Sequence, residues 1–146
     1  MTGGRLDAGV IRRHVAALRE SIGRLRGIRG VDETALRTRI ELRWAVERGL
    51  QVCVQNALDI ATHIAAGSGM DTPDYASAID RLGELGVLQP AFAARLRPMA
   101  GFRNVLVHAY LETDPAIVIR VLREGLDEIE KFAGCVEKWL ADVGNR

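Results

Sequence analysis

The sequence ETALRTRIELRWAVERGLQVCVQNALDIATHIAA, at residues 33–66, decides the fold of this chain. Nine positions along it, separated by alternating steps of four and three residues, form one face of an α-helix, and seven of them are apolar. The two exceptions are Arg43 and Glu47. We therefore predict one long helix that forms the central pillar of the fold and ends at Gly67-Ser68-Gly69. The seven apolar positions are Leu36, Ile40, Leu50, Val54, Ala57, Ala61 and Ile64.

Four further helical segments flank this pillar. Thr72-Pro73 is typical of a helix cap followed by a first-turn proline, and Asp114-Pro115 repeats that pattern. Pro98 interrupts the segment between them, because a proline inside a helix removes a backbone hydrogen bond. Short connections between long amphipathic helices predict an all-α fold, an antiparallel bundle of four or five helices. The flanking segments are residues 6–25, 72–85, 90–110 and 115–140.

The composition indicates a single helical domain over residues 1–146. Hydrophobic residues make up 48% of the chain and aromatic residues only 5%, which suits packed helices better than a β-sandwich. No stretch approaches the roughly 18 uncharged apolar residues of a membrane span, and residues 1–14 lack the apolar run of a secretory signal. We expect a cytoplasmic protein that does not bind membranes. Cys53 and Cys135 fall in apolar helical patterns and are expected to be buried free thiols.

Charge is distributed unevenly although the net charge is only +1. Residues 1–30 hold seven arginines and two acids, whereas residues 112–146 hold eight acids and five bases. Two interpretations are open for the basic first helix. It could hold RNA phosphates, or it could be a solvated face that pairs in part with the acidic last helix.

Residues 103–110, RNVLVHAY, place four polar side chains at the end of an otherwise apolar helix. A cationic side chain near a helix C-terminus is often structural, because it offsets the helix dipole. Asn104 and His108 share a face, but Arg103 and His108 point about 140° apart at about 100° per residue. One helix would not easily aim both at a single phosphate. A second copy of the helix, related by a two-fold axis, could bring one chain's arginine near the other's histidine, so we predict a homodimeric site.

The pattern formed by Arg103, Asn104, His108 and Tyr110, Arg-Asn-x3-His-x-Tyr, resembles the signature of the HEPN superfamily and specifically its HepT branch. The similarity extends to RWAVERGLQVCVQNALDIATHI and to LGELGVLQPAFAARLRPMAGFRNVLVH, and covers roughly residues 34–139. The arginine-rich, glycine-punctuated first thirty residues depart from the family pattern.

The resemblance implies a toxin of a toxin–antitoxin pair, a metal-independent endoribonuclease that works as a homodimer without a cofactor. It also implies a partner, an MntA-type nucleotidyltransferase, which neutralises the toxin by transferring AMP to the tyrosine that Tyr110 matches. An added AMP would place bulk and negative charge where the phosphate of RNA must bind.

The residue chemistry suits this role. RNA supplies its own nucleophile, the 2′-hydroxyl, so an enzyme needs a proton donor or acceptor and a group that stabilises charge on the phosphorane. His108 can serve as general base or acid, since histidine titrates near neutrality. The fixed donors of Arg103 suit the charge that develops on the phosphate oxygens. We predict these two residues to be catalytic, with Asn104 in support.

A polar line along the pillar helix gives further candidates. Its members lie at steps of three and four and are Arg48, Gln51, Gln55, Asp59 and His63. Such a line is typical of a solvated face, although some of its members could line the groove beside the helix that carries residues 103–110.

Four residues of the pillar helix are possible cleft-lining residues: Asp59, His63, Arg43 and Glu47. Asp59 and His63 could form two legs of a metal site, but no third ligand is apparent, so we predict no metal. Arg43 and Glu47 could pair at i, i+4 and mark the dimer surface or the cleft wall.

Two other functions remain open at this stage. The same fold could serve as a non-catalytic substrate-binding or regulatory subunit of a nucleotidyltransferase, or as a plain helical dimerisation protein. The presence of both Arg103 and His108 favours the nuclease, because a scaffold does not need both.

Overall fold

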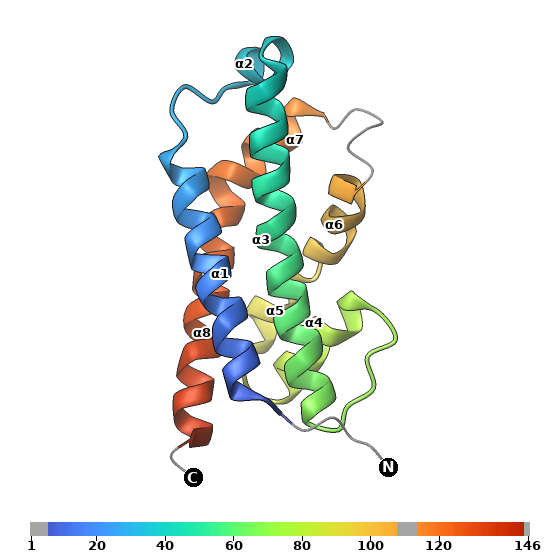
Figure 1. Cartoon of the computed structure of the whole chain (residues 1–146). Coiled ribbons are helices and arrows are strands. Elements are labelled where there is room, and N and C mark those ends of the chain that lie inside the picture. The colour runs from blue at the N-terminus through green and yellow to red at the C-terminus, as the bar shows by residue number, and fades with distance from the viewer. Residues whose placement is uncertain (1–5, 108–113, 145–146) are drawn as a thin grey trace.

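Helix α3 (Ile40–Gly67) runs the length of the molecule, and the other helices pack around it (Figure 1). The computed structural model describes residues 6–107 and 114–144, and every regular element within them is helical, as predicted. Helices α1 and α8 lie on one side of α3, with α4 and α6 on the other (Figure 1). The remaining bounds are α1 (Ala8–Gly27), α2 (Glu33–Thr38), α4 (Tyr75–Glu84), α5 (Pro90–Leu96), α6 (Met99–Val107), α7 (Pro115–Arg120), η2 (Val121–Gly125) and α8 (Leu126–Gly144).

The predicted single helix over residues 33–66 is wrong at its beginning. The chain breaks at Arg39, whose extended backbone (φ −112°, ψ 91°) separates α2 from α3. Leu36 is buried, with only 1% of its surface exposed, in the short α2 that contacts α7 as well as α3. Ile40 is the first residue of α3 after this break, and its side chain is 58% exposed instead of buried in the expected apolar stripe.

The other helix ends follow local signals in the sequence. The carboxylate of Asp114 accepts a hydrogen bond from the Ala116 N–H at 2.9 Å, which confirms the predicted cap of α7. Helix α4 begins two residues later than predicted, because Asp74 supplies the cap and accepts from the Ser77 N–H at 2.7 Å. This backbone hydrogen bond lowers the pKa of Asp74.

The proline break is also confirmed, since α5 and α6 flank Pro98. The last predicted helix is helical throughout, although η2 inserts a π-helical turn between α7 and α8.

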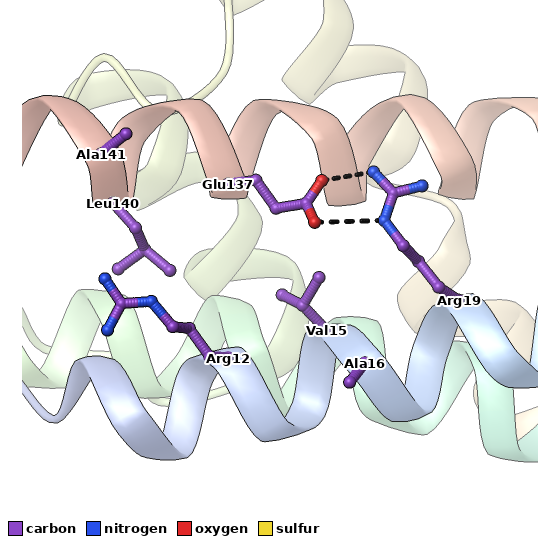
Figure 2. Close-up of a pocket in the computed structure, with 7 residues that line it drawn as sticks. All are labelled: Arg12, Val15, Ala16, Arg19, Glu137, Leu140 and Ala141. Atoms are coloured by element: carbon purple, nitrogen blue, oxygen red, sulfur yellow. Dashed lines mark hydrogen bonds and ion pairs between the residues drawn. The ribbon is translucent and has the colours of Figure 1, made fainter.

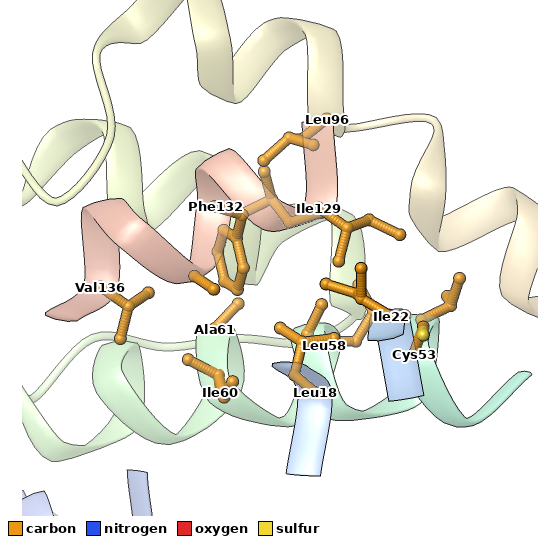
Figure 3. Close-up of a cluster of buried hydrophobic side chains, with 14 of the residues drawn as sticks. Leu18, Ile22, Cys53, Leu58, Ile60, Ala61, Leu96, Ile129, Phe132 and Val136 are labelled. Atoms are coloured by element: carbon orange, nitrogen blue, oxygen red, sulfur yellow. The ribbon is translucent and has the colours of Figure 1, made fainter. Parts of the chain in front are cut away.

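The hydrophobic core lies between α1, α3 and α8. Phe132 of α8 reaches toward Ala61 of α3, and Leu18 of α1 points into the same cluster (Figure 3). Burying each large apolar side chain of this kind contributes about 1.5–3 kcal/mol relative to leaving it exposed. The core therefore fixes α3 in place, and α3 in turn carries the polar face on the side of α4 and α6.

The cysteines are both free thiols. Cys53 is fully buried and Cys135 only partly, so the prediction of buried thiols is confirmed for the first and holds in part for the second. Burial raises the pKa of the Cys53 thiol to about 12.

The basic first helix pairs with the acidic last helix, which is the second of its two interpretations. Arg19 donates through Nε to one carboxylate oxygen of Glu137 at 3.2 Å and through Nη2 to the other (Figure 2). This interaction raises the pKa of Arg19. Arg26 bonds to Asp127 at 2.5 Å and to Glu130 at 2.7 Å. Within residues 6–107 and 114–144 we find no helix with the length and hydropathy of a membrane span.

Candidate functional site

Helix α6 aims its polar side chains away from the core. Phe102 and Leu106, four residues apart, face the interior, and Leu106 is only 3% exposed. Arg103 is half-buried and points toward α3 and α4, whereas Asn104 is exposed. His108 and Tyr110 lie outside the described residues.

Three neighbours hold the guanidinium of Arg103. Its Nε donates to Gln55 Oε1 of α3 at 3.1 Å, and its Nη1 donates to Asn104 Oδ1 at 3.2 Å. Its Cζ lies 5.5 Å from the centroid of the Tyr75 ring on α4, a cation–π distance. The arginine is thus held by three helices.

The amide of Gln55 links this arginine to two more groups. Gln55 Nε2 donates to Asp59 Oδ1 at 2.8 Å and to the Tyr75 hydroxyl at 3.1 Å. Arg103, Gln55, Tyr75 and Asp59 therefore form one connected set of contacts, which we call the arginine network.

All partners of Arg103 in the described part of the chain are neutral. No carboxylate there lies within 4.0 Å of its guanidinium, whereas Arg43, Arg81 and Arg97 each form an ion pair. The positive charge of Arg103 is therefore not neutralised by these residues and can attract an anion such as a phosphate.

Arg43 and Glu47 form the predicted i, i+4 ion pair on α3, with Nε and Oε1 2.9 Å apart. The pair is largely buried, since the Glu47 residue is only 8% exposed. Buried ion pairs are costly to break, because the remaining charge loses both its partner and its water.

Asp59 and His63, the other two possible cleft-lining residues on α3, lie in different surroundings. Asp59 joins the arginine network, whereas His63, one turn further along, has a buried Nε2 without a hydrogen-bond partner among the described residues. Those residues contain no group of three or more His, Cys, Asp or Glu side chains that could hold a metal ion.

Two members of the arginine network were missed as site residues. Gln55 belongs to the polar line of the pillar helix, some of whose members were expected to line the groove, but it was not singled out, and its spacing to Asp59 was the available signal. Tyr75 lies in the helix predicted over residues 72–85, and nothing local in the sequence distinguishes it from a core aromatic.

A second feature of the surface is a set of large hydrophobic side chains that remain exposed. The exposed large hydrophobic side chains of the described residues are Ile40 at 58%, Trp44 at 66% and Val105 at 43%. The first two lie one turn apart on α3, and Val105 follows Arg103 by two residues on α6, a helix that contacts α3. Trp44 is therefore not a core residue, whereas Trp139 packs partly buried against the core.

Comparison with known proteins identifies the family. The sequence model of the HepT-like ribonucleases matches residues 18–136. The mRNA nuclease HepT of Shewanella oneidensis is 26% identical over 129 residues, which are 88% of this chain and 96% of that protein. The tRNA nuclease HepT of Aphanizomenon flos-aquae is 31% identical over 102 residues, 68% of this chain and 69% of that protein.

A solved structure agrees with these sequence matches. The tri-AMPylated HEPN toxin of Shewanella oneidensis, in complex with its MNT antitoxin, superposes with a TM-score of 0.78 at 25% identity, over 88% of this chain and 97% of that one. The fold, the motif and the family match agree, and the chain belongs to the HepT-like ribonuclease family.

Proposed function

We propose that this chain is an endoribonuclease toxin of a toxin–antitoxin pair, with Arg103 and His108 as its catalytic residues and Asn104 in support. The observation that supports this most directly is the state of Arg103. It is half-buried, held by three helices and opposed by no carboxylate among the described residues. A preorganised cation of this kind stabilises a transition state as soon as charge develops, because it has little reorganisation left to make.

The proposed reaction uses the nucleophile of RNA itself. His108 takes the proton of a 2′-hydroxyl as that oxygen attacks the adjacent phosphorus. The bond from phosphorus to the 5′-oxygen then breaks. That oxygen takes up a proton from a histidine side chain in its protonated, imidazolium form. The products are a 2′,3′-cyclic phosphate and a 5′-hydroxyl end. Arg103 stabilises the charge on the non-bridging oxygens, so no step requires a metal or another cofactor.

The proposed working unit is a homodimer. On a regular helix Arg103 and His108 would point about 140° apart, and this spacing favours a site that takes one residue from each of two chains. Ile40, Trp44 and Val105 have exposed side chains, the first two on α3 and the third on α6, the helix that carries Arg103. We assign a second copy of this chain to these exposed hydrophobic side chains, because a contact at Val105 would bring the two α6 helices toward each other.

The proposed antitoxin is an MntA-type nucleotidyltransferase that transfers AMP to Tyr110. The Shewanella oneidensis toxin of similar fold is tri-AMPylated and bound to an MNT antitoxin, and Tyr110 follows His108 by two residues in the shared motif. Mass spectrometry after co-expression with the nucleotidyltransferase should find adenylate mass on the Tyr110 peptide. Full neutralisation with an unmodified Tyr110 would instead indicate simple sequestration.

The central test is RNA cleavage by the purified protein in EDTA. The wild type should cut RNA, and both Arg103→Ala and His108→Ala should abolish cleavage while they keep the fold. Arg24→Ala is a matched control, because Arg24 is an exposed arginine that pairs with Glu20 on its own helix. Expression of the wild type alone should arrest growth. A folded wild type that neither cuts RNA nor arrests growth would favour the regulatory-subunit alternative.

A further inference from the structure

The arginine network contains an amide whose orientation is fixed by a charged neighbour. The amide of Gln55 has a donor end and an acceptor end, and either could face Arg103. A guanidinium has only donors, so it requires the acceptor end. The network therefore functions only while the amide keeps one of its two orientations.

Asp59 selects that orientation. Its ionised carboxylate only accepts hydrogen bonds, so the Gln55 Nε2 group must face it, as the 2.8 Å contact shows. The Tyr75 hydroxyl, 3.1 Å from the same Nε2, can donate or accept and would tolerate both orientations. With Nε2 held by Asp59, Oε1 is left to face Arg103 Nε at 3.1 Å.

Gln55 also keeps negative charge away from the arginine. It stands between the Asp59 carboxylate and the guanidinium, so Asp59 orders Arg103 without forming an ion pair with it. The Tyr75 ring lies against the guanidinium and restricts its movement on another side. Among the described residues, Gln55 and Asn104 accept from two of the five N–H donors of Arg103, and none of those residues takes the other three.

We propose that Gln55, Asp59 and Tyr75 are positioning residues that hold the guanidinium of Arg103 with its remaining donors directed at the phosphate of RNA. This inference rests on the proposed function, in which Arg103 acts on the phosphate. The three residues themselves do not touch the substrate. They raise kcat because the arginine is ordered before the charge develops.

The first test is an isosteric change, Gln55→Glu. It puts a carboxylate beside Arg103 Nε, where it competes with the phosphate, and kcat should fall at least tenfold while KM changes less. The matched control is Gln51→Glu, one turn earlier on α3, where the glutamine accepts from Arg48 at 3.2 Å and does not contact Arg103. That control should keep kcat within about twofold of the wild type.

Two pairs of variants separate positioning from mere structural support. Asp59→Ala should lower kcat about tenfold, and Asp59→Asn should restore only part of the loss, because the asparagine amide can accept from Gln55 Nε2 but can also turn and donate. Tyr75→Leu should lower kcat about tenfold, whereas Tyr75→Phe, which keeps the ring beneath the guanidinium, should cost less. The Tm of each variant, measured in parallel, should not rank the variants in the same order as kcat does.

A second measurement does not depend on cleavage. In a ¹⁵N NMR spectrum, the Nε–H of Arg103 should exchange slowly with water in the wild type, faster in Asp59→Asn and fastest in Asp59→Ala. Loss of cleavage in Arg103→Ala, together with wild-type kcat in Gln55→Glu and Tyr75→Leu, would overturn the positioning role alone. Absence of cleavage in the wild type would overturn the proposed function, and the NMR comparison would then still decide whether Asp59 orders Arg103.

Discussion

The guanidinium of Arg103 lies against the ring of Tyr75, with Cζ 5.5 Å from the ring centroid. The contact joins α6 to α4 and involves two residues that are 28 positions apart in the sequence. It explains why a charged side chain can stay half-buried without a carboxylate partner in the described part of the chain, since the ring face attracts the cation and leaves its net charge unchanged.

Lysine should not replace Arg103. Arg103→Lys keeps the positive charge but loses the Nε–H donor to Gln55 and the flat group that lies against Tyr75. We expect kcat for RNA cleavage to fall about 100-fold, or about 2.7 kcal/mol of transition-state stabilisation. Arg97→Lys is the control, because Arg97 pairs with Asp80 at the surface and should tolerate the change. Unchanged kcat in Arg103→Lys would show that charge alone is sufficient.

A composite active site should be restored by mixing two inactive chains. If one chain supplies Arg103 and the other His108, a mixed dimer of Arg103→Ala and His108→Ala contains one site with both residues intact. Random mixing makes half of the dimers mixed, and one of their two sites is complete, so about a quarter of wild-type activity should return. Cleavage is measured after the two chains have been unfolded and refolded together. A site built within one chain would give no recovery.

The exposed tryptophan of α3 should control the oligomeric state. Trp44→Glu puts a charge in place of a hydrophobic side chain that is 66% exposed and should convert a dimer to a monomer in light scattering, with loss of cleavage. Trp44→Phe keeps an apolar ring and should remain dimeric. A monomeric wild type that cuts RNA would rule out the dimer, and a dimeric Trp44→Glu would place its interface elsewhere.

The buried ion pair of α3 should be necessary for stability. Arg43→Ala leaves the buried carboxylate of Glu47 without the arginine that pairs with it and should lower the free energy of unfolding by about 3 kcal/mol. Glu20→Ala is the control, because it breaks an i, i+4 ion pair with Arg24 that is well exposed and should cost about 0.5 kcal/mol at most. Denaturant titration of both variants measures the difference, and equal losses would contradict the importance of burial.

The buried thiol predicts a loss of stability in alkali. The pKa of Cys53 rises from 9.0 to about 12 in the folded chain, so between these values the unfolded chain releases a proton that the folded chain keeps. The free energy of unfolding should therefore fall as pH rises from about 9 toward 12, and Cys53→Ala should remove that part of the slope. At pH 8 a thiol reagent should modify the partly buried Cys135 first and reach Cys53 only on unfolding, which mass spectrometry can follow. Rapid labelling of Cys53 in the native chain would contradict its burial.

The sequence by itself determined the helices, most of their ends and the family motif. Asp114 capped its helix as predicted, Pro98 separated two helices, and the spacing of Arg43 and Glu47 predicted their ion pair. Each of these features acts within about one helical turn, so neighbouring residues are sufficient to specify it. The motif that contains Arg103 and Asn104 was readable for the same reason.

Only the tertiary structure decided which residues surround Arg103 and which apolar side chains stay exposed. Gln55 is 48 positions from Arg103 and meets it because α6 packs on α3. The chain breaks at Arg39, the short α2 before the break contacts α7 as well as α3, and Ile40 after it is exposed where a core position was expected. Such contacts depend on how whole helices pack, and a periodic pattern gives the face of a helix but not the partner that covers it.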